Sequence, residues 1–394
     1  MKNVYDMMEE KNATANIENF KMLQSLDHDS KVRHAAKVAQ SFYDTISAEN
    51  KNCHVSVGGL DSITLHYFLD SLGIYVPCIS CSSLEDKSLQ AVHKKIAEEM
   101  QDAFPHWEDD YYGAEHIPTK PEFYFLKPLK PKVQVIKEFG WPVLSKEVAG
   151  KIMNLQRQTS KNATVRHAII TGETGEYGGN RSGSRMQLAD KWLQKFGGAD
   201  PEGAALGYSA APFKVSDRCC YYLKERPCDL WAKEHNSVPY LGLMASEGGR
   251  RAKSLQINGC NYYSKAATRS APFAIFSRQD ILQLALDLNV PVPEIYGTIE
   301  QKADGTLYTT GAQRTGCSMC GFGIHLEGRP HRFDQLKQSN RKEWDFWMNH
   351  VMQDENGEWY GWGRVLDYIG IGWADDPSGQ LDGQLDMFGN EIGN

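Results

Sequence analysis

The expected architecture follows from one segment, Ser56-Val57-Gly58-Gly59-Leu60-Asp61-Ser62. The short apolar stretch Cys53 to Val57 is predicted to be a strand that leads into it. Apolar residues at helical spacing follow it, namely Leu65, Phe68, Leu69 and Leu72. A Gly-rich turn between a strand and a helix leaves N–H groups free at the helix N-terminus, where glycine lets an anion approach closely. The segment therefore predicts a phosphate site, and a turn without a ligand is the alternative.

The composition is that of an ordinary globular protein. The chain has 394 residues, of which 41% are apolar and 24% charged, so it can form one large α/β domain with additions. Its net charge of −7 argues against nonspecific coating of nucleic acid. The polar, acidic start Met1 to Lys11 does not resemble a signal peptide, and no long apolar run suggests a membrane segment. We therefore expect a cytoplasmic protein that does not bind membranes.

Further strand and helix patterns predict a doubly wound, mostly parallel sheet. Tyr75 to Ser80 is expected to be a second strand, and Leu89 to Met100 has the periodicity of an amphipathic helix. Ala168 to Gly172 and Pro239 to Ala245 are interpreted as further buried strands. Ligands of parallel sheets bind at the carboxyl ends of the strands. The loop Ser80 to Lys87 is therefore a candidate nucleotide contact.

Several polar residues follow the predicted strands or sit in Gly-rich turns. Glu173 follows the expected strand at Ala168 to Gly172, although a plain turn explains it nearly as well. Arg250 and Arg251 end the Gly-rich turn that begins at Ser246, and arginines in such a turn suit an anion. His93 is interpreted as a packed or half-exposed helix residue, not as a catalyst.

Composition along the chain suggests four segments. Residues 1–50 are expected to form an N-terminal helical cap, and residues 51–335 the main α/β domain. Residues 336–374 form a Trp-rich, helical C-terminal extension. Residues 375–394 are expected to be a flexible tail, since they begin with an Asp-, Pro- and Gly-containing stretch.

Two pairs of cysteines stand out among the nine cysteines of the chain. Cys219 and Cys220 are adjacent, and Cys317 and Cys320 form a C-x2-C turn among glycines. In a chain with no export signal, such pairs favour metal ligands over disulfides. The four thiols suit a [4Fe-4S] cluster, because adjacent cysteines fit separate iron atoms better than one zinc. A structural zinc site and buried free thiols are the alternatives, with Cys228 and Cys260 as spare thiols.

These motifs together resemble the phosphoadenylylsulfate (PAPS) reductase superfamily of PP-loop proteins. SVGGLDS is similar to its SGGxDS loop, and the CC…CxxC pattern, with about a hundred residues between the pairs, is similar to that of adenylylsulfate reductases. Arg218, Lys224 and Pro227 match the basic and proline residues beside the family's CC pair. Gly242 to Arg251, Arg269 to Asp280 and Pro291 to Gly297 resemble further segments of the family. The likeness covers about residues 50 to 335.

The resemblance implies an adenine nucleotide, either ATP or a sulfonucleotide, at the Gly-rich loop. The phosphate contacts would come from the loop and from two outlying residues: Ser56, Gly58, Gly59, Leu60, Asp61, Ser62, Glu173 and Arg269. Asp61 would order the loop or hold Mg²⁺, while Lys224, Arg250 and Arg251 would neutralise charge on the leaving phosphate. Val57 departs from the family, since it stands where the pattern has its first serine.

A second departure bears on the reaction. Sulfonucleotide reductases carry a nucleophilic cysteine on a C-terminal tail, whereas no cysteine follows Cys320 here. The similar sulfurtransferases of DNA phosphorothioation and of tRNA instead pair ATP activation with an iron–sulfur cluster. We therefore expect nucleotide activation and sulfur transfer, with nucleic acid as a candidate acceptor. Sulfonucleotide reduction through Cys228, Cys260 or a partner's thiol is the alternative, and a nucleotide-binding subunit without turnover is a third.

The C-terminal tail carries the apolar peptide Gln384-Leu385-Asp386-Met387-Phe388. An apolar cluster on a polar, Gly-flanked tail suits docking in a partner's groove. It resembles the pentapeptide by which bacterial proteins bind the replication sliding clamp, with contacts expected from Gln384, Leu385, Met387 and Phe388. The alternative is that the tail folds back on its own domain.

Overall fold

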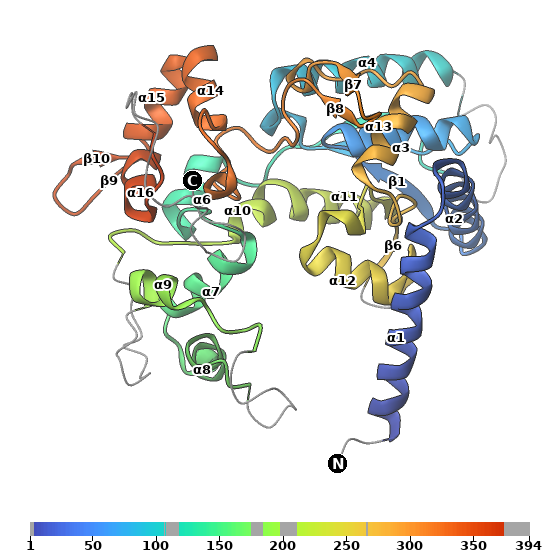
Figure 1. Cartoon of the computed structure of the whole chain (residues 1–394). Coiled ribbons are helices and arrows are strands. Elements are labelled where there is room, and N and C mark those ends of the chain that lie inside the picture. The colour runs from blue at the N-terminus through green and yellow to red at the C-terminus, as the bar shows by residue number, and fades with distance from the viewer. Residues whose placement is uncertain are drawn as a thin grey trace. The chain divides into compact units, whose positions relative to one another are not determined.

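The computed structural model describes residues 4–105, 107, 118–174, 184–197, 211–264 and 267–373. It divides into two units, Met1–Pro128 with Lys224–Ser318 and Leu129–Leu223 with Met319–Asn394. Figure 1 labels many of their helices and strands. The boundaries expected after residues 50 and 335 fall inside the first and the second unit. Within the described ranges, no helix combines the length and the apolar composition that crossing a membrane requires.

The first unit is built on a six-stranded sheet with the order β3-β2-β1-β4-β6-β5. Neighbouring strands are parallel, except that β5 runs antiparallel to β6. The strands are β1 (Asn52–Ser56), β2 (Cys78–Ser80), β3 (Phe123–Phe125), β4 (Ser237–Tyr240), β5 (Asn261–Tyr263) and β6 (Thr268–Ser270). The protein is thus α/β with a mostly parallel sheet, as the sequence predicts. The strand order reverses between β1 and β4, which is where doubly wound sheets bind ligands.

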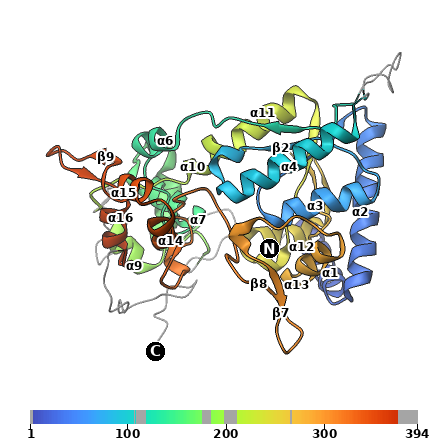
Figure 2. The same ribbon diagram turned by 90° about the horizontal axis from the view of Figure 1, so that it is seen from above.

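Helices connect and cover these strands. They are α1 (Val4–Gln24), α2 (His28–Ala48), α3 (Leu60–Ser71), α4 (Lys87–Ala103), α11 (Arg226–Glu234), α12 (Gly249–Asn258) and α13 (Arg278–Asp287). A small hairpin, β7 (Ile299–Gln301) and β8 (Leu307–Thr309), follows α13. Figure 2 shows α3 and α4 side by side, and Tyr67 Oη donates to Glu99 Oε2 between them at 2.6 Å.

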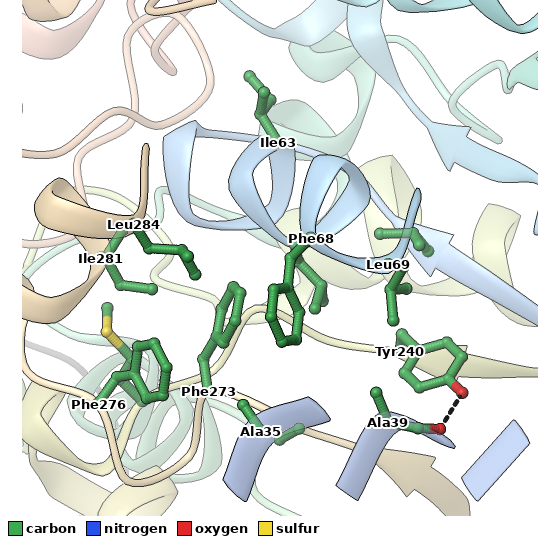
Figure 3. Packing of buried hydrophobic residues seen from close by; sticks show 14 of the residues in the cluster. Ala35, Ala39, Ile63, Phe68, Leu69, Tyr240, Phe273, Phe276, Ile281 and Leu284 are labelled. Carbon is green, nitrogen blue, oxygen red and sulfur yellow. Dashed lines mark hydrogen bonds between the residues drawn. The ribbon is translucent and has the colours of Figure 1, made fainter. Parts of the chain in front are cut away.

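The core of the first unit holds α3 in place (Figure 3). Phe68 points from α3 toward Tyr240 and Phe273, and all three rings are at most 2% exposed. Burying one such aromatic side chain contributes about 2 to 3 kcal/mol. On the other side of the rings lie Ala35 and Ala39 of α2, whose small side chains allow Tyr240 Oη to donate to Ala39 O at 2.8 Å. The helix that begins at the Gly-rich loop is therefore anchored from both α2 and the sheet.

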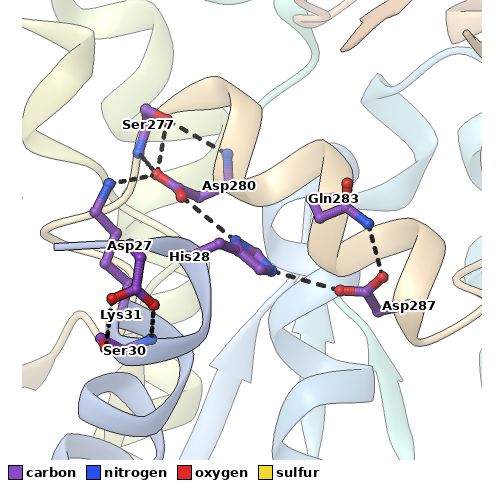
Figure 4. A network of polar contacts seen from close by, with 8 residues as sticks. All are labelled: Asp27, His28, Ser30, Lys31, Ser277, Asp280, Gln283 and Asp287. Atoms are coloured by element: carbon purple, nitrogen blue, oxygen red, sulfur yellow. Dashed lines mark hydrogen bonds and ion pairs between the residues drawn. The ribbon is translucent and has the colours of Figure 1, made fainter. Parts of the chain in front are cut away.

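A buried ion pair joins α2 to the start of α13 (Figure 4). Asp280 Oδ2 accepts from Lys31 Nζ at 2.8 Å and from both the backbone N and the hydroxyl of Ser277 at 2.7 Å. His28 Nδ1 lies 3.3 Å from Asp280 Oδ1. Ser277 and Asp280 form a reciprocal capping box, which satisfies N–H groups at the helix start. The network thereby fixes the first turn of α13.

The second unit is mainly helical. It contains the longer helices α6 (Lys132–Phe139), α7 (Lys146–Gln156), α8 (Ala163–Thr171), α14 (Arg332–Ser339), α15 (Arg341–Asn349) and α16 (Trp362–Ile369), with the single turns α9 (Asp190–Trp192) and α10 (Arg218–Cys220). A hairpin of β9 (Met352–Gln353) and β10 (Trp359–Tyr360) precedes α16. In the core of this second unit, Trp141 and Trp362 are fully buried, and their ring centroids lie 4.7 Å apart.

The strand expected at Ala168 to Gly172 is wrong, because these residues end α8. Ala168, Ile169 and Ile170 are all buried, so the apolar run lacks the polar positions that would reveal a helix. Gly172 adopts a left-handed φ of 76° and its N–H donates to Ala168 O, which is a typical helix C-cap. The glycine that suggested the end of a strand therefore ends a helix.

We predict that Asp280→Asn lowers the free energy of unfolding by about 3 kcal/mol at neutral pH, because it leaves Lys31 buried without its counter-charge. Burial opposes ionisation of Asp280, but hydrogen bonds from Lys31 and Ser277 hold its pKa below the usual value. The contribution is therefore complete above about pH 4 and is lost as the pH falls further. Urea unfolding between neutral and acidic pH measures it.

The matched control is Asp287→Asn. This carboxylate also contacts His28, at 3.4 Å, but its side chain is 48% exposed. We expect a change below about 0.5 kcal/mol, as for other exposed pairs. Equal effects of the two substitutions, or an unchanged acid dependence in Asp280→Asn, would show that the buried pair does not stabilise the unit.

Candidate functional site

The Gly-rich loop lies where the strand order reverses, at the carboxyl end of β1. Ser56 is the last residue of β1, and Gly59 is the residue immediately before α3. Val57 is 5% exposed and packs in the core. Val57, which departs from the pattern that the loop resembles, is therefore part of the core. A ligand at the loop would meet mainly backbone atoms.

Hydroxyl groups accept two of the loop's N–H groups. Gly58 N donates to Ser62 Oγ at 2.7 Å, and Ser62 Oγ donates to Gly59 O at 2.9 Å. Leu60 N donates to Tyr296 Oη at 3.2 Å. In the part of the chain that the structure describes, the N–H groups of Gly59 and Asp61 have no acceptor. The start of α3 thus offers two unused donors beside two that are capped by neutral oxygens.

His93 supports the loop from α4. It is fully buried; its Nε2 lies 2.9 Å from Gly58 O and its Nδ1 lies 2.7 Å from Ser82 Oγ. Because a carbonyl oxygen only accepts, Nε2 carries the proton and Nδ1 accepts from Ser82. Burial lowers the pKa of His93, which favours this neutral form. His93 is packed, as the sequence suggests, but its contact with Gly58 was not foreseen.

Two glycines permit the close contacts around the loop. A Cβ on Gly242, just after β4, would lie 3.0 Å from the backbone of Asp61 and Ser62. A Cβ on Gly59 would lie 2.6 Å from Tyr296 Oη, whereas one on Gly58 would meet nothing closer than 3.9 Å. A side chain at residue 242 would therefore be packed more tightly than nearly all Cβ contacts, so the chain leaving β4 or the start of α3 would have to shift by a few tenths of an ångström.

Asp61 lies in a mainly basic setting on the first turn of α3. Its Oδ1 accepts from Arg278 Nη1 at 2.5 Å. Burial raises the pKa of Asp61, as does the charge of Glu247, while Arg278 and Arg314 act in the opposite direction. Arg278 Nη2 is buried and has no hydrogen-bond partner in the described part of the chain. One buried guanidinium nitrogen beside the loop is therefore left without an acceptor in the described part of the chain.

A second charged pair lies next to Gly58. Glu85, in the loop after β2, is 7% exposed and forms an ion pair with Lys224 Nζ. Its Oε1 lies 3.9 Å from the position that a Cβ on Gly58 would take. Burial acts against the charge of Lys224, but Cys317 and Glu85 raise its pKa, so the side chain is an ammonium at neutral pH. The predicted loop Ser80 to Lys87 thus does adjoin the Gly-rich loop.

No protein-family model matches this chain, and no curated protein matches it significantly.

The remaining residues predicted to bind phosphate or to neutralise its charge are Arg269, Arg251, Arg250 and Glu173. Arg269, on β6, donates to Ser254 Oγ at 3.0 Å and lies over the ring of Tyr262, with no hydrogen bond to the loop. Arg251, on α12, is 65% exposed and lies 3.3 Å from Glu247. Of Arg250, only the backbone lies within the described structure. Glu173 belongs to the second unit, where its exposed carboxylate oxygen Oε2 lies 2.9 Å from His167 Nε2.

The four predicted cluster ligands are divided between the units. Cys317 belongs to the first unit, and Cys219, Cys220 and Cys320 belong to the second. None of them forms a disulfide; Cys219 is buried and the other three are half-buried. Within either unit alone, the described His, Cys, Asp and Glu side chains form no group of three suited to a metal. The tail residues Gln384, Leu385, Met387 and Phe388 lie outside the described residues.

Sequence reasoning missed three residues of this site: Arg278, Tyr296 and Glu85. Arg278 follows Ser277 in a Ser-x-x-Asp capping box, so its position at a helix start was detectable but its contact with Asp61 was not. Tyr296 falls in the segment Pro291 to Gly297 that resembles the family. Glu85 lies in the loop that was predicted as a nucleotide contact.

We predict that Gly59→Ala destabilises the protein by about 1 to 3 kcal/mol, because its methyl group would overlap Tyr296 Oη. The backbone conformation is not the obstacle, since the φ of Gly59 is −86°. Adding Tyr296→Phe removes the overlapping oxygen, so the double variant should lose less than the sum of the single changes. Thermal or urea unfolding of the set measures this.

Gly58→Ala is the control, since its methyl group would meet only ordinary contacts. Its unfolding midpoint should stay close to that of the wild type. A Gly59→Ala variant as stable as Gly58→Ala would contradict the close packing of Tyr296 on the loop.

Proposed function

We propose that the protein is a PP-loop enzyme of the PAPS reductase type, which binds an adenine nucleotide and a [4Fe-4S] cluster and acts in nucleotide activation and sulfur transfer. The observation that carries the proposal is the position of Gly58 and Gly59. They precede a helix N-terminus with two unused N–H donors, at the strand-order reversal of the sheet. The resemblance of SVGGLDS to the SGGxDS loop points to the same ligand.

The charged residues of the first unit suit the cleavage of ATP between its α- and β-phosphates. The N–H groups of the loop would hold phosphate oxygens, and the free Nη2 of Arg278 would donate to another. Lys224 forms an ion pair with Glu85, whose carboxylate lies near Gly58. Its ammonium would neutralise charge on the leaving pyrophosphate. Arg278 already holds Asp61, which favours a loop-ordering role for this carboxylate over binding Mg²⁺.

In this reaction an acceptor atom attacks the α-phosphorus and pyrophosphate leaves with the electron pair of the broken P–O bond. A sulfur nucleophile then displaces AMP from the adenylated acceptor, for which nucleic acid is the candidate. Cys219, Cys220, Cys317 and Cys320 would hold the cluster; none of the four forms a disulfide, and cysteine sulfur is the ligand that iron–sulfur clusters use. When bound, the cluster would supply sulfur or electrons. A zinc ion is the alternative occupant.

Sulfonucleotide reduction is the second candidate, and one observation favours it. Cys228 lies on α11 only four residues after Lys224, so a half-buried thiol accompanies the ammonium that adjoins the loop. Cys260, the other spare thiol, lies instead near His34, with Sγ and Nε2 3.9 Å apart. Sulfite release from adenylylsulfate or its 3′-phosphate, with thioredoxin present, separates this reaction from pyrophosphate release from ATP.

We predict that Ser62→Ala weakens ATP binding about tenfold, because the hydroxyl that joins Gly58 N to Gly59 O, and with it the local order of the loop, is lost. Isothermal titration calorimetry with ATP measures the affinity. The control is Ser71→Ala at the other end of α3, where the hydroxyl makes a similar bond to Phe68 O at 2.7 Å. Its affinity should equal that of the wild type. Absence of ATP and adenylylsulfate binding by the wild type would refute the proposal.

We further predict that protein purified without oxygen contains about four iron atoms and four labile sulfides per chain. Replacing Cys320 by serine should lower both, whereas Cys53→Ser, at a buried strand residue, should leave both unchanged. One zinc and no labile sulfide would remove the cluster from the proposal but leave nucleotide binding intact. Nucleotide binding without any turnover would favour a non-catalytic subunit.

A further inference from the structure

A cavity of about 330 Å³ lies in the first unit, and none of its lining residues belongs to the Gly-rich loop. The lining comes from α1, α2, the C-terminal end of α12 and the start of β5, and Figure 1 shows α1 beside α12. Glu247, whose charge acts on Asp61, precedes the other end of α12. Because the 10 residues of α12 span about 15 Å, the cavity is separate from the site at the loop.

The polar part of the lining consists largely of side-chain amides. Five carboxamides contribute to it: Asn16, Asn19, Gln256, Asn258 and Asn261. The described lining holds no Asp, Glu, Lys or Arg, although these residue types make up 24% of the chain. An ionic ligand would give up its hydration in this cavity without gaining a counter-charge. The lining therefore favours a neutral ligand.

The imidazole and the thiol of the lining are uncharged as well. Cys260 Sγ lies 3.9 Å from His34 Nε2. Burial, together with the charge of Lys37, lowers the pKa of His34, and burial raises the pKa of Cys260 to about 11. At neutral pH the two side chains are therefore a neutral imidazole and a thiol, and not an ion pair. The described lining thus brings no charge of its own to the cavity.

One amide of the lining is held in place by the protein, and two others are free to bind. Asn261 Nδ2 donates to Val38 O at 3.0 Å, and Asn261 Oδ1 accepts from Ser270 Oγ at 2.7 Å. The side chains of Asn19 and Gln256, in contrast, form no hydrogen bond within the described ranges. Each of them offers a donor and an acceptor side by side to a ligand.

The rest of the lining is apolar. Phe20 and Leu23 of α1 line the cavity together with Val38 of α2 and with Ile257 of α12. Phe20 is 4% exposed and packs in the core. A flat molecule can contact this apolar wall with its face and the carboxamides with its edge. Nucleobases have this form, because their faces stack on aromatic side chains and their edges carry neutral donors and acceptors that match carboxamides.

We propose that the cavity binds a neutral nucleobase, either of a free nucleoside or of an unpaired nucleotide in a single strand. Asn19 and Gln256 would pair with the edge of the base, and Phe20 would lie against its face. The cavity volume is at the lower end of the range of about 300 to 1,000 Å³ that small-molecule sites occupy. The inference goes beyond the proposed function and does not rest on it, because the cavity and the Gly-rich loop share no residue.

Isothermal titration calorimetry of the full-length protein with adenosine, guanosine, cytidine and uridine tests the proposal. We expect at least one nucleoside to bind with the same affinity at low and at high salt, because salt screens charges and not neutral hydrogen bonds. ATP held at the loop would instead bind less tightly at high salt, so the two proposals fail independently. If none of the four nucleosides binds, the inference is wrong.

Gln256→Leu should weaken nucleoside binding about tenfold, because neutral hydrogen bonds to the edge of the base are lost. The matched control is Gln283→Leu on α13, whose side chain lies outside the cavity and donates to Asp287 at 2.8 Å. Its affinity should equal that of the wild type. The same affinity in the wild type and in both variants would place the nucleoside elsewhere and overturn the assignment.

The wild-type protein locates the ligand without any variant. Cys260 is part of the lining, so a bound nucleoside should slow its alkylation, measured by mass spectrometry of peptides, and leave the half-buried Cys228 on α11 unaffected. Unchanged alkylation of Cys260 at a saturating nucleoside concentration would contradict the site. Competition by a single-stranded oligonucleotide would identify nucleic acid as the source of the base, and its absence would identify a free nucleoside.

Discussion

The close approach of two backbones at residue 242 is the constraint on which the candidate site depends. The chain leaving β4 passes so close to the first turn of α3 that a Cβ on Gly242 would lie 3.0 Å from backbone atoms of Asp61 and Ser62, so the two segments meet through main-chain atoms. Because β1 and β4 are parallel neighbours at the point where the strand order reverses, both chain ends open on the same edge of the sheet. The position of the N–H groups of the loop is thus determined by sheet topology.

The surrounding side chains belong to elements that are themselves fixed elsewhere. The capping box of Ser277 and Asp280, tied to α2 through Lys31, sets the direction of α13, whose first residue is Arg278. Arg278 in turn holds Asp61. On the other flank, His93 joins α4 to Gly58 O. The N-terminal helices, which carry no recognisable motif, thereby contribute indirectly to the order of the loop.

Much of this arrangement could be predicted from the sequence, because it follows from local patterns. The strand before Gly58 and the helices α3 and α4 have clear patterns and are present as expected. The short apolar run at Ile169 and Ile170 was misassigned because burial on all sides hides the helical period. The contacts of Arg278 and Tyr296 with the loop, and the ion pair of Glu85 with Lys224, could not be predicted, since they join residues that only tertiary packing brings together.

The hydroxyl groups of Ser62 and Tyr296 have a consequence for ligand selection. Each hydroxyl oxygen already accepts a hydrogen bond from an N–H group of the loop. A ligand oxygen that bonds to either N–H group would therefore replace an oxygen of the protein. A sugar hydroxyl or an amide carbonyl would gain almost nothing by this exchange, because it is no better an acceptor than the group it displaces. A phosphate or sulfate oxygen would gain, since its full charge strengthens the bond. The internal acceptors thus favour an anionic ligand over a neutral one at the N–H groups of Gly58 and Leu60.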